Sequence, residues 1–532
     1  MIHATVKNLL RTRNVFLAAL FVGLFAMAAR NVTDPDVWWH LKTGQYIADH
    51  RSVPHTDPFS YTRGGQPWVA HEWLSELLLY ELERTTGWGG LILIFAAILT
   101  AAFFLLYLRC GPATYVAGVA TLVAAWATVP LWGVRPQILS LLLTSLWLLI
   151  LDRSERNPKL LWWTLPLTLL WVNLHAGFAV GLALSALYLV GEWIERTLGR
   201  SRQSPSGFRF AALIFLLDVL IVPLNPNGLR MFSYPIETLR SPAMQKYIAE
   251  WASPNFHHAE YLPFLLVVLT TFAALSWSPL ELRLRDLLLL LVSLYAALVS
   301  IRLIPLFVLI AVPLVATRLG DWPRSDGRFT QPVAVSLLNG LILLAMAAFA
   351  GVHAAQVIQR QPRVEIERFP TRAVAFLQNH PPRGRIFNHY DWGGYLIWKL
   401  YPSTPVFIDG RADLYGQQLF DQFAQTYQFK GDWRQPFQRW GIDTVIVPPA
   451  SALATGLQNS PGWTVSYEDS QAIVLTALPN AIRREPASAK PSKPNPWKSS
   501  QLESHAKAAK QLPSVCKKVH LLKHFAGYYE GD

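Results

Sequence analysis

The sequence has few charged residues and almost no cysteine. Among its 532 residues only 15% are charged and two are cysteines, whereas an ordinary soluble domain has roughly 25% charged residues. Cys110 and Cys516 lie far apart, which argues against a disulfide framework and leaves no recognisable metal-ligand spacing. The composition therefore argues against a soluble globular domain, and cysteine chemistry can be set aside.

Apolar residues fill the place of the missing charges. They make up 52% of the chain, with 21 tryptophans and a mean hydropathy of +0.25. Runs of about 17 to 25 apolar residues are long enough to span a bilayer, and about eleven such runs occur. The sequence therefore predicts a polytopic α-helical membrane protein with about 11 transmembrane helices. The predicted spans are 14–30, 88–108, 112–131, 136–152, 159–174, 177–195, 209–224, 261–278, 286–301, 303–319 and 332–352.

The net charge of +13 has its own pattern. Basic residues lie mostly in alternate short loops and in the last fifty residues, not on one helical face, so we expect no nucleic-acid partner. With a cytoplasmic N-terminus, the loops on the other side keep only Arg135 and Arg302 as basic residues of short turns. This asymmetry follows the positive-inside rule and predicts that the region after residue 352 faces outward.

Three parts follow from these patterns. Residues 1–352 form the predicted membrane domain, with outer loops at 31–87 and 225–260, and residues 353–480 form an outward-facing α/β domain. Its predicted helices are 371–380 and 416–427, and its short strands include "RIFNH", "PVFID", "DTVIVPP", "WTVSYED" and "QAIVLTA". Residues 481–532 are rich in Pro, Ser and Lys, which predicts a mostly disordered basic tail.

The stretch "NVTDPDVWWHLKTGQYIADH", residues 31–50, places carboxylates directly after the first span. Asp34-Pro35-Asp36 is a good helix start, so these residues could simply cap a helix. Asp36 and His40 are four residues apart and would share one helical face. The same outer loop ends in His71 and Glu72. Carboxylates and imidazoles near a membrane surface suit either a divalent metal or a general base.

Other outer segments contribute further candidates. Asn173 and His175 lie in "WVNLHAGF", where the alternative is capping of a broken helix, and Arg302 could be a residue that snorkels to the interface. Asp409, Arg411 and Asp413 cluster in "FIDGRADLY" after a predicted strand. We interpret this cluster as a salt-bridged turn that docks the soluble domain, with a ligand site at the strand end as the alternative.

The motifs "DPDVWWHLKTGQYI", "WVAHEWLSE", "WVNLHAGF", "LNPNG", "EWASP" and "YDWGGYLIW…VFIDGRADLY" resemble those of uncharacterised bacterial membrane proteins of the C-type glycosyltransferase superfamily. An acidic motif after the first span, about eleven spans and an outer soluble domain are similar to the architecture of its mannosyl, aminoarabinose and oligosaccharyl transferases. The sequence departs from the best-known mannosyltransferases by having "HEW" where a proline-rich segment is expected.

The resemblance implies an enzyme of the bacterial cytoplasmic membrane. Such an enzyme transfers a sugar from a polyprenyl-phosphate or polyprenyl-diphosphate carrier to an acceptor on the outer face. It implies Asp34 as the catalytic base, with Asp36 as the alternative. The supporting residues would be His40, His71, Glu72, Asn173 and His175, and the phosphate-binding residues Arg302, Lys246 and Arg135.

A divalent cation, Mg²⁺ or Mn²⁺, is a candidate cofactor, with Asp36, His40 and Glu72 as candidate ligands. Two other functions remain open, a transporter or flippase of lipid-linked glycans and a non-catalytic glycan-assembly protein. A transporter should bury ionisable residues in several spans, whereas here only Asp218 and Glu192 lie there.

Overall fold

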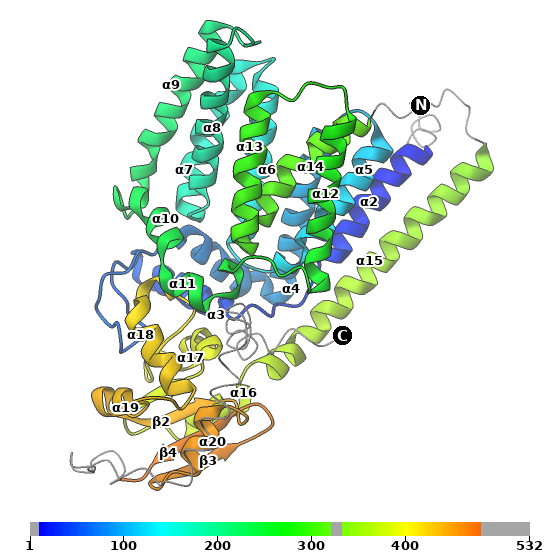
Figure 1. The fold of residues 1–532 in the computed structure, drawn as a ribbon. Helices are drawn as coiled ribbons and strands as arrows, with labels where there is room; N and C mark the ends of the chain where they lie inside the picture. Colours follow the sequence, from blue (N-terminus) through cyan, green and yellow to red (C-terminus); the bar gives the residue numbers. More distant parts are fainter. Residues whose placement is uncertain (1–9, 321–331, 480–532) are drawn as a thin grey trace, which may run out of the picture. The chain divides into compact units, whose positions relative to one another are not determined.

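The computed structural model describes residues 10–320 and 332–479 (Figure 1). The predicted tail at 481–532 lies outside this part. Each of the eleven predicted spans coincides with an apolar helix. These helices are α2 (Thr12–Ala28), α4 (Trp73–Arg109), α5 (Thr114–Thr128), α6 (Gln137–Ser154), α7 (Thr164–Leu174), α8 (Phe178–Thr197), α9 (Pro205–Ile221), α12 (Leu262–Trp277), α13 (Leu284–Val299), α14 (Ile304–Leu319) and α15 (Val333–Arg368).

Eight helical segments of the described residues are long and apolar enough to cross a membrane. Some of them include a short 3-10 turn at one end, for example η1 (Val129–Leu131), η3 (Val222–Leu224), η5 (Ala259–Tyr261) and η6 (Ile301–Leu303). Helices α2, α7 and α13 are shorter, with 17, 11 and 16 residues. The chain is thus a multi-pass membrane protein, and the three shorter helices remain predicted spans.

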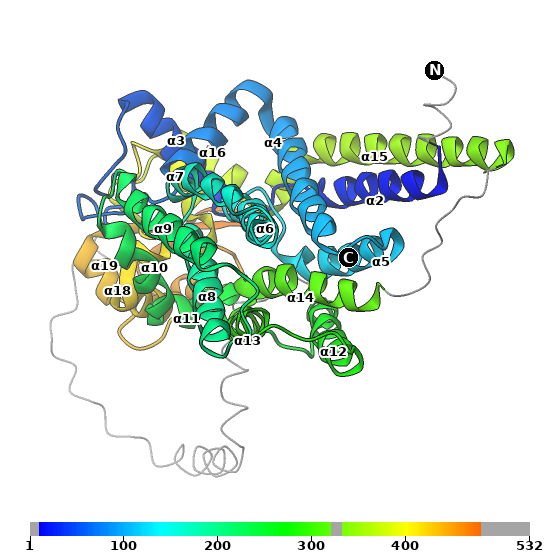
Figure 2. The same ribbon diagram turned by 90° about the horizontal axis from the view of Figure 1, so that it is seen from above.

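The loop after α2 folds into α3 (Val37–His50), which packs against the first part of α4. Gly44 makes this close crossing possible, because a Cβ there would lie 2.1 Å from the Glu76 carbonyl oxygen. Helix α4 bends at Gly87, whose φ is 63° (Figure 2). The bend separates the polar start of α4 from its apolar run, so the start of α4 can lie against α3.

The second outer loop is also helical. It contains α10 (Arg230–Arg240), α11 (Pro242–Tyr247) and η4 (Ala249–Trp251). Another 3-10 segment, η2 (Pro158–Trp163), precedes α7.

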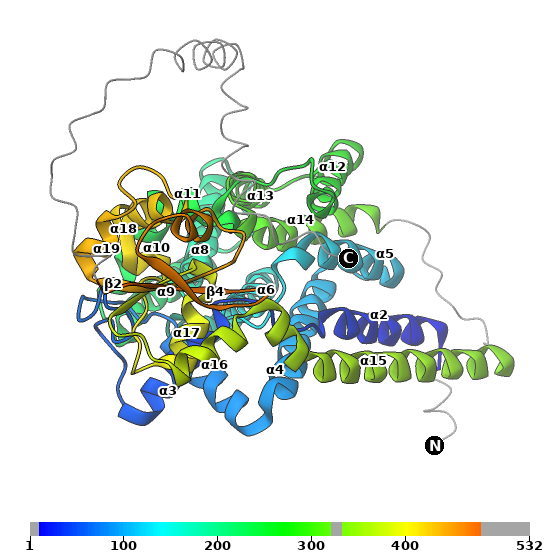
Figure 3. The same ribbon diagram turned by 90° about the horizontal axis from the view of Figure 1, so that it is seen from below.

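A four-stranded sheet follows α15. Its order is β1-β2-β4-β3, with β1 (Arg385–Asn388) parallel to β2 (Ile442–Val447), and with β4 (Ile473–Ala477) antiparallel to β2 and to β3 (Trp463–Glu468). Figure 3 shows α17 close to α3, and the two helices are in contact. The helices of this region are α16 (Thr371–Asn379), η7 (Tyr390–Trp392), α17 (Gly393–Leu400), α18 (Ala412–Tyr427), α19 (Gln435–Trp440) and α20 (Ala452–Gln458).

Two sequence predictions need correction here. The predicted strand "PVFID" is not part of the sheet, because Val406 pairs instead with Ser60 of the first loop in an isolated parallel bridge. The predicted boundary between 352 and 353 falls inside α15, which continues to Arg368. The α/β region and the first loop therefore share backbone hydrogen bonds.

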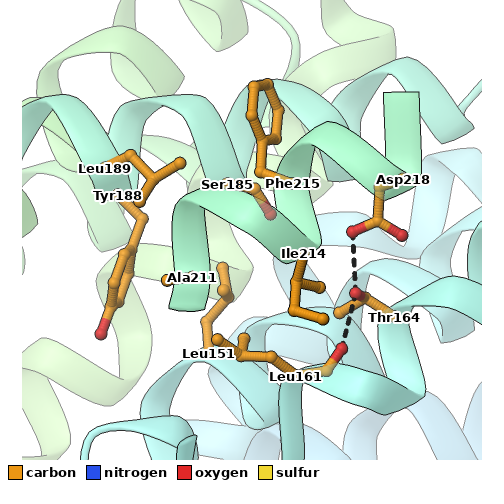
Figure 4. A pocket seen from close by; sticks show the side chains of 10 residues that line it. All are labelled: Leu151, Leu161, Thr164, Ser185, Tyr188, Leu189, Ala211, Ile214, Phe215 and Asp218. Atoms are coloured by element: carbon orange, nitrogen blue, oxygen red, sulfur yellow. Dashed lines mark hydrogen bonds between the residues drawn. The ribbon is translucent and has the colours of Figure 1, made fainter. Parts of the chain in front are cut away.

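Asp218 is a carboxylate within a predicted span, and it faces other helices. It accepts hydrogen bonds from the hydroxyls of Thr164 and Thr168 at 2.8 and 2.7 Å. Figure 4 shows Asp218 and Thr164 at a small cavity between helices, with a volume of about 10 Å³. A cavity of that volume holds about one water molecule. The hydrogen bonds of Asp218 to Thr164 and Thr168 join α9 to α7, so we interpret Asp218 as a structural residue.

Candidate functional site

The Asp34-Pro35-Asp36 turn lies between α2 and α3 and meets two distant segments. The Asp34 Oδ2 lies 2.9 Å from the Arg135 Nε, and the Arg135 Nη1 lies 2.5 Å from the Glu250 Oε1. Burial lowers the pKa of Arg135, but Asp34 and Glu250 more than offset this, so its pKa is above the usual value. Arg135, predicted to bind phosphate, is therefore already held by two carboxylates.

Asp34 also has a local structural role. Its Oδ1 accepts the backbone N–H of Asp36 at 2.9 Å, which closes the turn before α3. The side chain of Asp36 makes no cap hydrogen bond. The helix-start interpretation thus holds in part for Asp34.

Asp36 has a different environment. Its Oδ1 accepts a hydrogen bond from the Trp39 Nε1 at 3.1 Å. Gly410 comes so close that a Cβ there would lie 1.7 Å from the same oxygen. Burial and then the Asp34 charge raise the pKa of Asp36 to about 7. A carboxylate with this pKa is suited to accept a proton near neutral pH.

Glu72 lies at the centre of three histidines. Its Oε1 is 3.0 Å from the His71 Nε2 and 3.3 Å from the His175 Nε2, and its Oε2 is 3.6 Å from the His40 Nδ1. Burial raises the pKa of Glu72, but His71, His175 and His40 more than offset this, so its pKa is well below the usual value. The structure thus brings together four of the five predicted supporting residues, and their role stays a prediction.

The pKa values of the three imidazoles are shifted in different directions. The His175 Nδ1 accepts the Gly177 N–H at 2.9 Å and lies 2.7 Å from the Ser140 Oγ, and burial lowers the pKa of His175 to about 3. The low pKa favours the neutral form of His175, whose Nε2 lies 3.3 Å from the Glu72 Oε1. Burial also lowers the pKa of His71, but the charge and hydrogen bond of Glu72, with the charges of Asp413 and Glu76, together outweigh it, so the pKa of His71 is above its usual value.

Sequence analysis missed several members of the site. Glu76 lies 3.4 Å from His40 and is one helical turn after Glu72, a spacing that could have identified it. Glu250, the partner of Arg135, had no signal because it lies 216 residues after Asp34 in another loop. Asp57 was missed because its ion-pair partner, Arg411, lies 354 residues later in the sequence.

Three other predicted residues lie around this group. Asn173 accepts the Trp73 Nε1–H at 2.8 Å and donates to the Leu169 carbonyl at 2.8 Å, so it joins the end of α7 to α4. The Arg302 guanidinium lies 5.6 Å from the centre of the Trp251 ring and makes no ion pair with any residue in the described ranges. Lys246 is paired at 2.9 Å with Asp421 of α18.

The "FIDGRADLY" cluster forms a buried clamp. The Arg411 Nη1 lies 2.7 Å from the Asp57 Oδ1, and its Nη2 lies 2.7 Å from the Asp409 Oδ2. All three side chains are fully buried. Arg411 also stacks at 4.6 Å over the Trp68 ring. The cluster therefore docks the α/β region onto the first loop.

Of the three predicted metal ligands, His40 and Glu72 face each other, and Asp36 does not join them. Asp36 faces Trp39 and Gly410, whereas His40 faces Glu72 and Glu76. In the part of the chain that the structure describes, no group of three or more His, Cys, Asp or Glu side chains is arranged to hold a metal ion. The divalent cation stays a prediction.

Comparison with known proteins gives matches at the level of structure only. No protein-family model matches the chain, and no curated protein matches it significantly. The arabinofuranosyltransferase AftD from mycobacteria matches with a TM-score of 0.50 and 15% identity, over 88% of this chain and 40% of AftD. The oligosaccharyltransferase AglB from Archaeoglobus fulgidus, in complex with an inhibitory peptide and a dolichol-phosphate, matches with a TM-score of 0.53 and 9% identity, over 81% of this chain and 69% of AglB.

The chain has the fold of the C-type membrane glycosyltransferases. ArnT from Cupriavidus metallidurans, bound to undecaprenyl phosphate, also matches over 88% of this chain and 98% of ArnT, with 12% identity and a TM-score of 0.48. This chain spans less than half the length of AftD. The expected superfamily resemblance is thus confirmed at the level of the fold.

Proposed function

We propose that this protein transfers a sugar from a polyprenyl-phosphate or polyprenyl-diphosphate carrier to an acceptor hydroxyl on the outer face of the cytoplasmic membrane. The observation that supports this most is the carboxylate of Asp36, poised near neutral pH and adjacent to Arg135. The fold is shared with AglB, whose structure contains dolichol-phosphate.

In the proposed reaction the acceptor oxygen attacks the anomeric carbon. The bond between this carbon and the phosphate oxygen breaks, and the electron pair leaves with the phosphate. Asp36 takes the proton from the acceptor hydroxyl. Sequence analysis favoured Asp34 for this role, but Asp34 is already paired with Arg135, and we now prefer Asp36.

The departing phosphate gains negative charge and needs a cation. Arg302 fits this requirement better than the other predicted phosphate ligands. Arg135 is held by two carboxylates and Lys246 by Asp421, whereas Arg302 has no such ion pair within the described residues. A divalent cation at this site would supply the same stabilisation of the phosphate.

The amide substitution Asp36→Asn tests this proposal. It keeps the size of the side chain but removes the proton acceptor, so we expect sugar transfer from a polyprenyl-phosphate donor to fall about a hundred- to ten-thousandfold. Asp34→Asn should keep more activity. Asp49→Asn, an exposed position in α3, is the matched control and should transfer normally. Full activity of Asp36→Asn at normal abundance would exclude Asp36 as the base.

A further inference from the structure

A second hollow lies beside the site, between the first loop, α10 and the start of α18. Its volume is about 290 Å³, and its walls include two aromatic rings and several polar side chains. The lining includes Trp68, Arg230, Tyr234, Glu237, Thr238 and Asp413. None of the roles assigned so far uses this pocket.

The walls combine flat rings with hydrogen-bonding groups. The Tyr234 hydroxyl donates to the Asp413 Oδ2 at 3.0 Å, and His71 packs against the Tyr234 ring with 4.4 Å between ring centres. Arg411 lies over the Trp68 ring and holds it in place. Trp68 and Tyr234 are almost fully buried, so the pocket presents mainly polar groups. Such walls suit a hydroxylated ligand such as a sugar, because its hydroxyls donate to carboxylate oxygens.

The charged groups of the pocket indicate which of the two substrates, the acceptor or the lipid-linked carrier, it would bind. Two carboxyl groups, Glu237 and Asp413, and one guanidinium, Arg230, line the pocket, and burial raises the pKa of the Asp413 carboxyl. The pocket therefore has no surplus of cations that would attract a phosphate. The cation proposed for the carrier phosphate, Arg302, instead lies near Glu250 together with Arg135. A neutral hydroxylated ligand fits the pocket better than the carrier.

Short paths join the pocket to Asp36. Trp39, which donates to Asp36, lies 6.5 Å from Trp68 between ring centres. Gly410 touches the Asp36 carboxylate, and Asp413 follows three residues later. A ligand in the pocket would therefore lie about one layer of side chains from Asp36.

We infer that this pocket binds the acceptor substrate and that the acceptor is a sugar residue. The inference rests on the proposed function, since an acceptor has meaning only for a transferase. The hydroxyls of the sugar donate to Asp413 and Glu237, and Trp68 and Tyr234 form part of the wall beside them. The pocket differs from the proposed carrier site in both charge and location.

Saturation-transfer NMR on the full-length protein in detergent tests this inference. The probes are methyl hexosides and methyl pentosides, with irradiation of the aromatic protein protons. We expect saturation of sugar ring protons for the wild type and for Asp34→Asn. The dissociation constant should rise about tenfold or more in Asp413→Asn, because a hydrogen bond to a charged group is lost. Glu237→Gln changes an exposed residue and gives a second variant with little risk to folding.

Asp391→Asn is the matched control, because Asp391 is exposed and outside the pocket. It should bind the probes like the wild type. Equal binding in all variants, or no glycoside binding, would overturn the inference. Binding of acetylated tripeptides in place of glycosides would overturn it too. Displacement of the glycoside by undecaprenyl phosphate would assign the pocket to the carrier and would also contradict it.

The two proposals fail in different ways. If glycosides bind as expected but the wild type transfers no sugar from any lipid-linked donor, the proposed function is wrong. If transfer occurs and depends on Asp36 while glycoside binding ignores Asp413, only the acceptor pocket is wrong.

Discussion

Single residues around Asp36 set the pH at which it can accept a proton. Burial and Asp34 raise its pKa to about 7, while His40, Trp39 and Arg135 oppose the rise. The ionised form is the base and disappears as the pH falls through about 7. We therefore expect the transfer rate to drop about tenfold per pH unit below about 6.

Asp34→Asn removes one of the charges that raise this pKa. It also frees Arg135, so both effects lower the pKa of Asp36. We predict that the pH profile of kcat/KM in Asp34→Asn has its acid midpoint at lower pH than in the wild type. Asp49→Asn, which leaves this group intact, should keep the wild-type midpoint. Identical midpoints in Asp34→Asn and the wild type would show that Asp36 does not govern the rate.

Residues close in sequence were the predictable part of the site. The sequence placed Asp36 and His40 one helical turn apart and named His71 and Glu72 at the end of the same loop. In the structure His71 lies 3.0 Å from Glu72, whereas Asp36 and His40 face different partners. Asp36 contacts Gly410, which lies several hundred residues later in the sequence. Arg135 contacts Glu250, which lies more than a hundred residues later. No local pattern encodes such contacts, because they depend on how the helices pack.

Secondary-structure elements meet at the turn that contains Gly410. This turn leads into α18 and presses against the Asp36 carboxylate, with no room for a Cβ. We predict that Gly410→Ala displaces the end of the Asp36 side chain and reduces the rate of sugar transfer about tenfold or more. The melting temperature should change little, since a flexible side chain can move. Gly351→Ala in α15 is the control, because nothing lies near its added Cβ.

If Gly410→Ala transferred at the normal rate, the close contact with Asp36 would have no part in catalysis. If Gly410→Ala failed to fold, the double variant Gly410→Ala/Asp36→Ala would test the reason. Asp36→Ala opens space for the added methyl group, so the double variant should regain the normal melting temperature.

The clamp between the first loop and α18 gives another prediction at this scale. Arg411→Leu would leave Asp57 and Asp409 buried without their cation. Removal of one partner from a buried ion pair costs about 3–5 kcal/mol, so we expect a clear fall in melting temperature. The exposed Arg434→Leu in the same region should have little effect. Equal stability of both variants would refute the clamp.

Across the elements, apolar periodicity located the long helices, whereas the short helices α10, α11, α17, α19 and α20 and the place of "PVFID" were not predicted. Its β-branched and aromatic residues resemble a buried strand, and four other such runs do form the sheet. This run is buried against the first loop instead. A short apolar run predicts burial without naming its partner.

The whole molecule places the first loop and the α/β region on one side of the membrane spans, since Arg411 joins them. The positive-inside pattern predicts that this side is the outer face. With both native cysteines replaced, Ser52→Cys and Ser466→Cys are exposed positions for labelling. Both should react with a membrane-impermeant thiol reagent in intact cells. Labelling of either only after the cells are opened would reverse the predicted orientation.

The most direct measurement is mass spectrometry of surface glycans and lipids in a strain that lacks this protein, complemented with the wild type, Asp36→Asn or Asp49→Asn. We predict that one glycan or glycolipid loses a single sugar residue, that its polyprenyl-phosphate-linked donor accumulates, and that the wild type and Asp49→Asn restore the product. Asp36→Asn, at equal abundance in the membrane, should not restore it. Full restoration by Asp36→Asn, or an unchanged set of glycans in the deficient strain, would contradict a lipid-linked sugar transferase centred on Asp36.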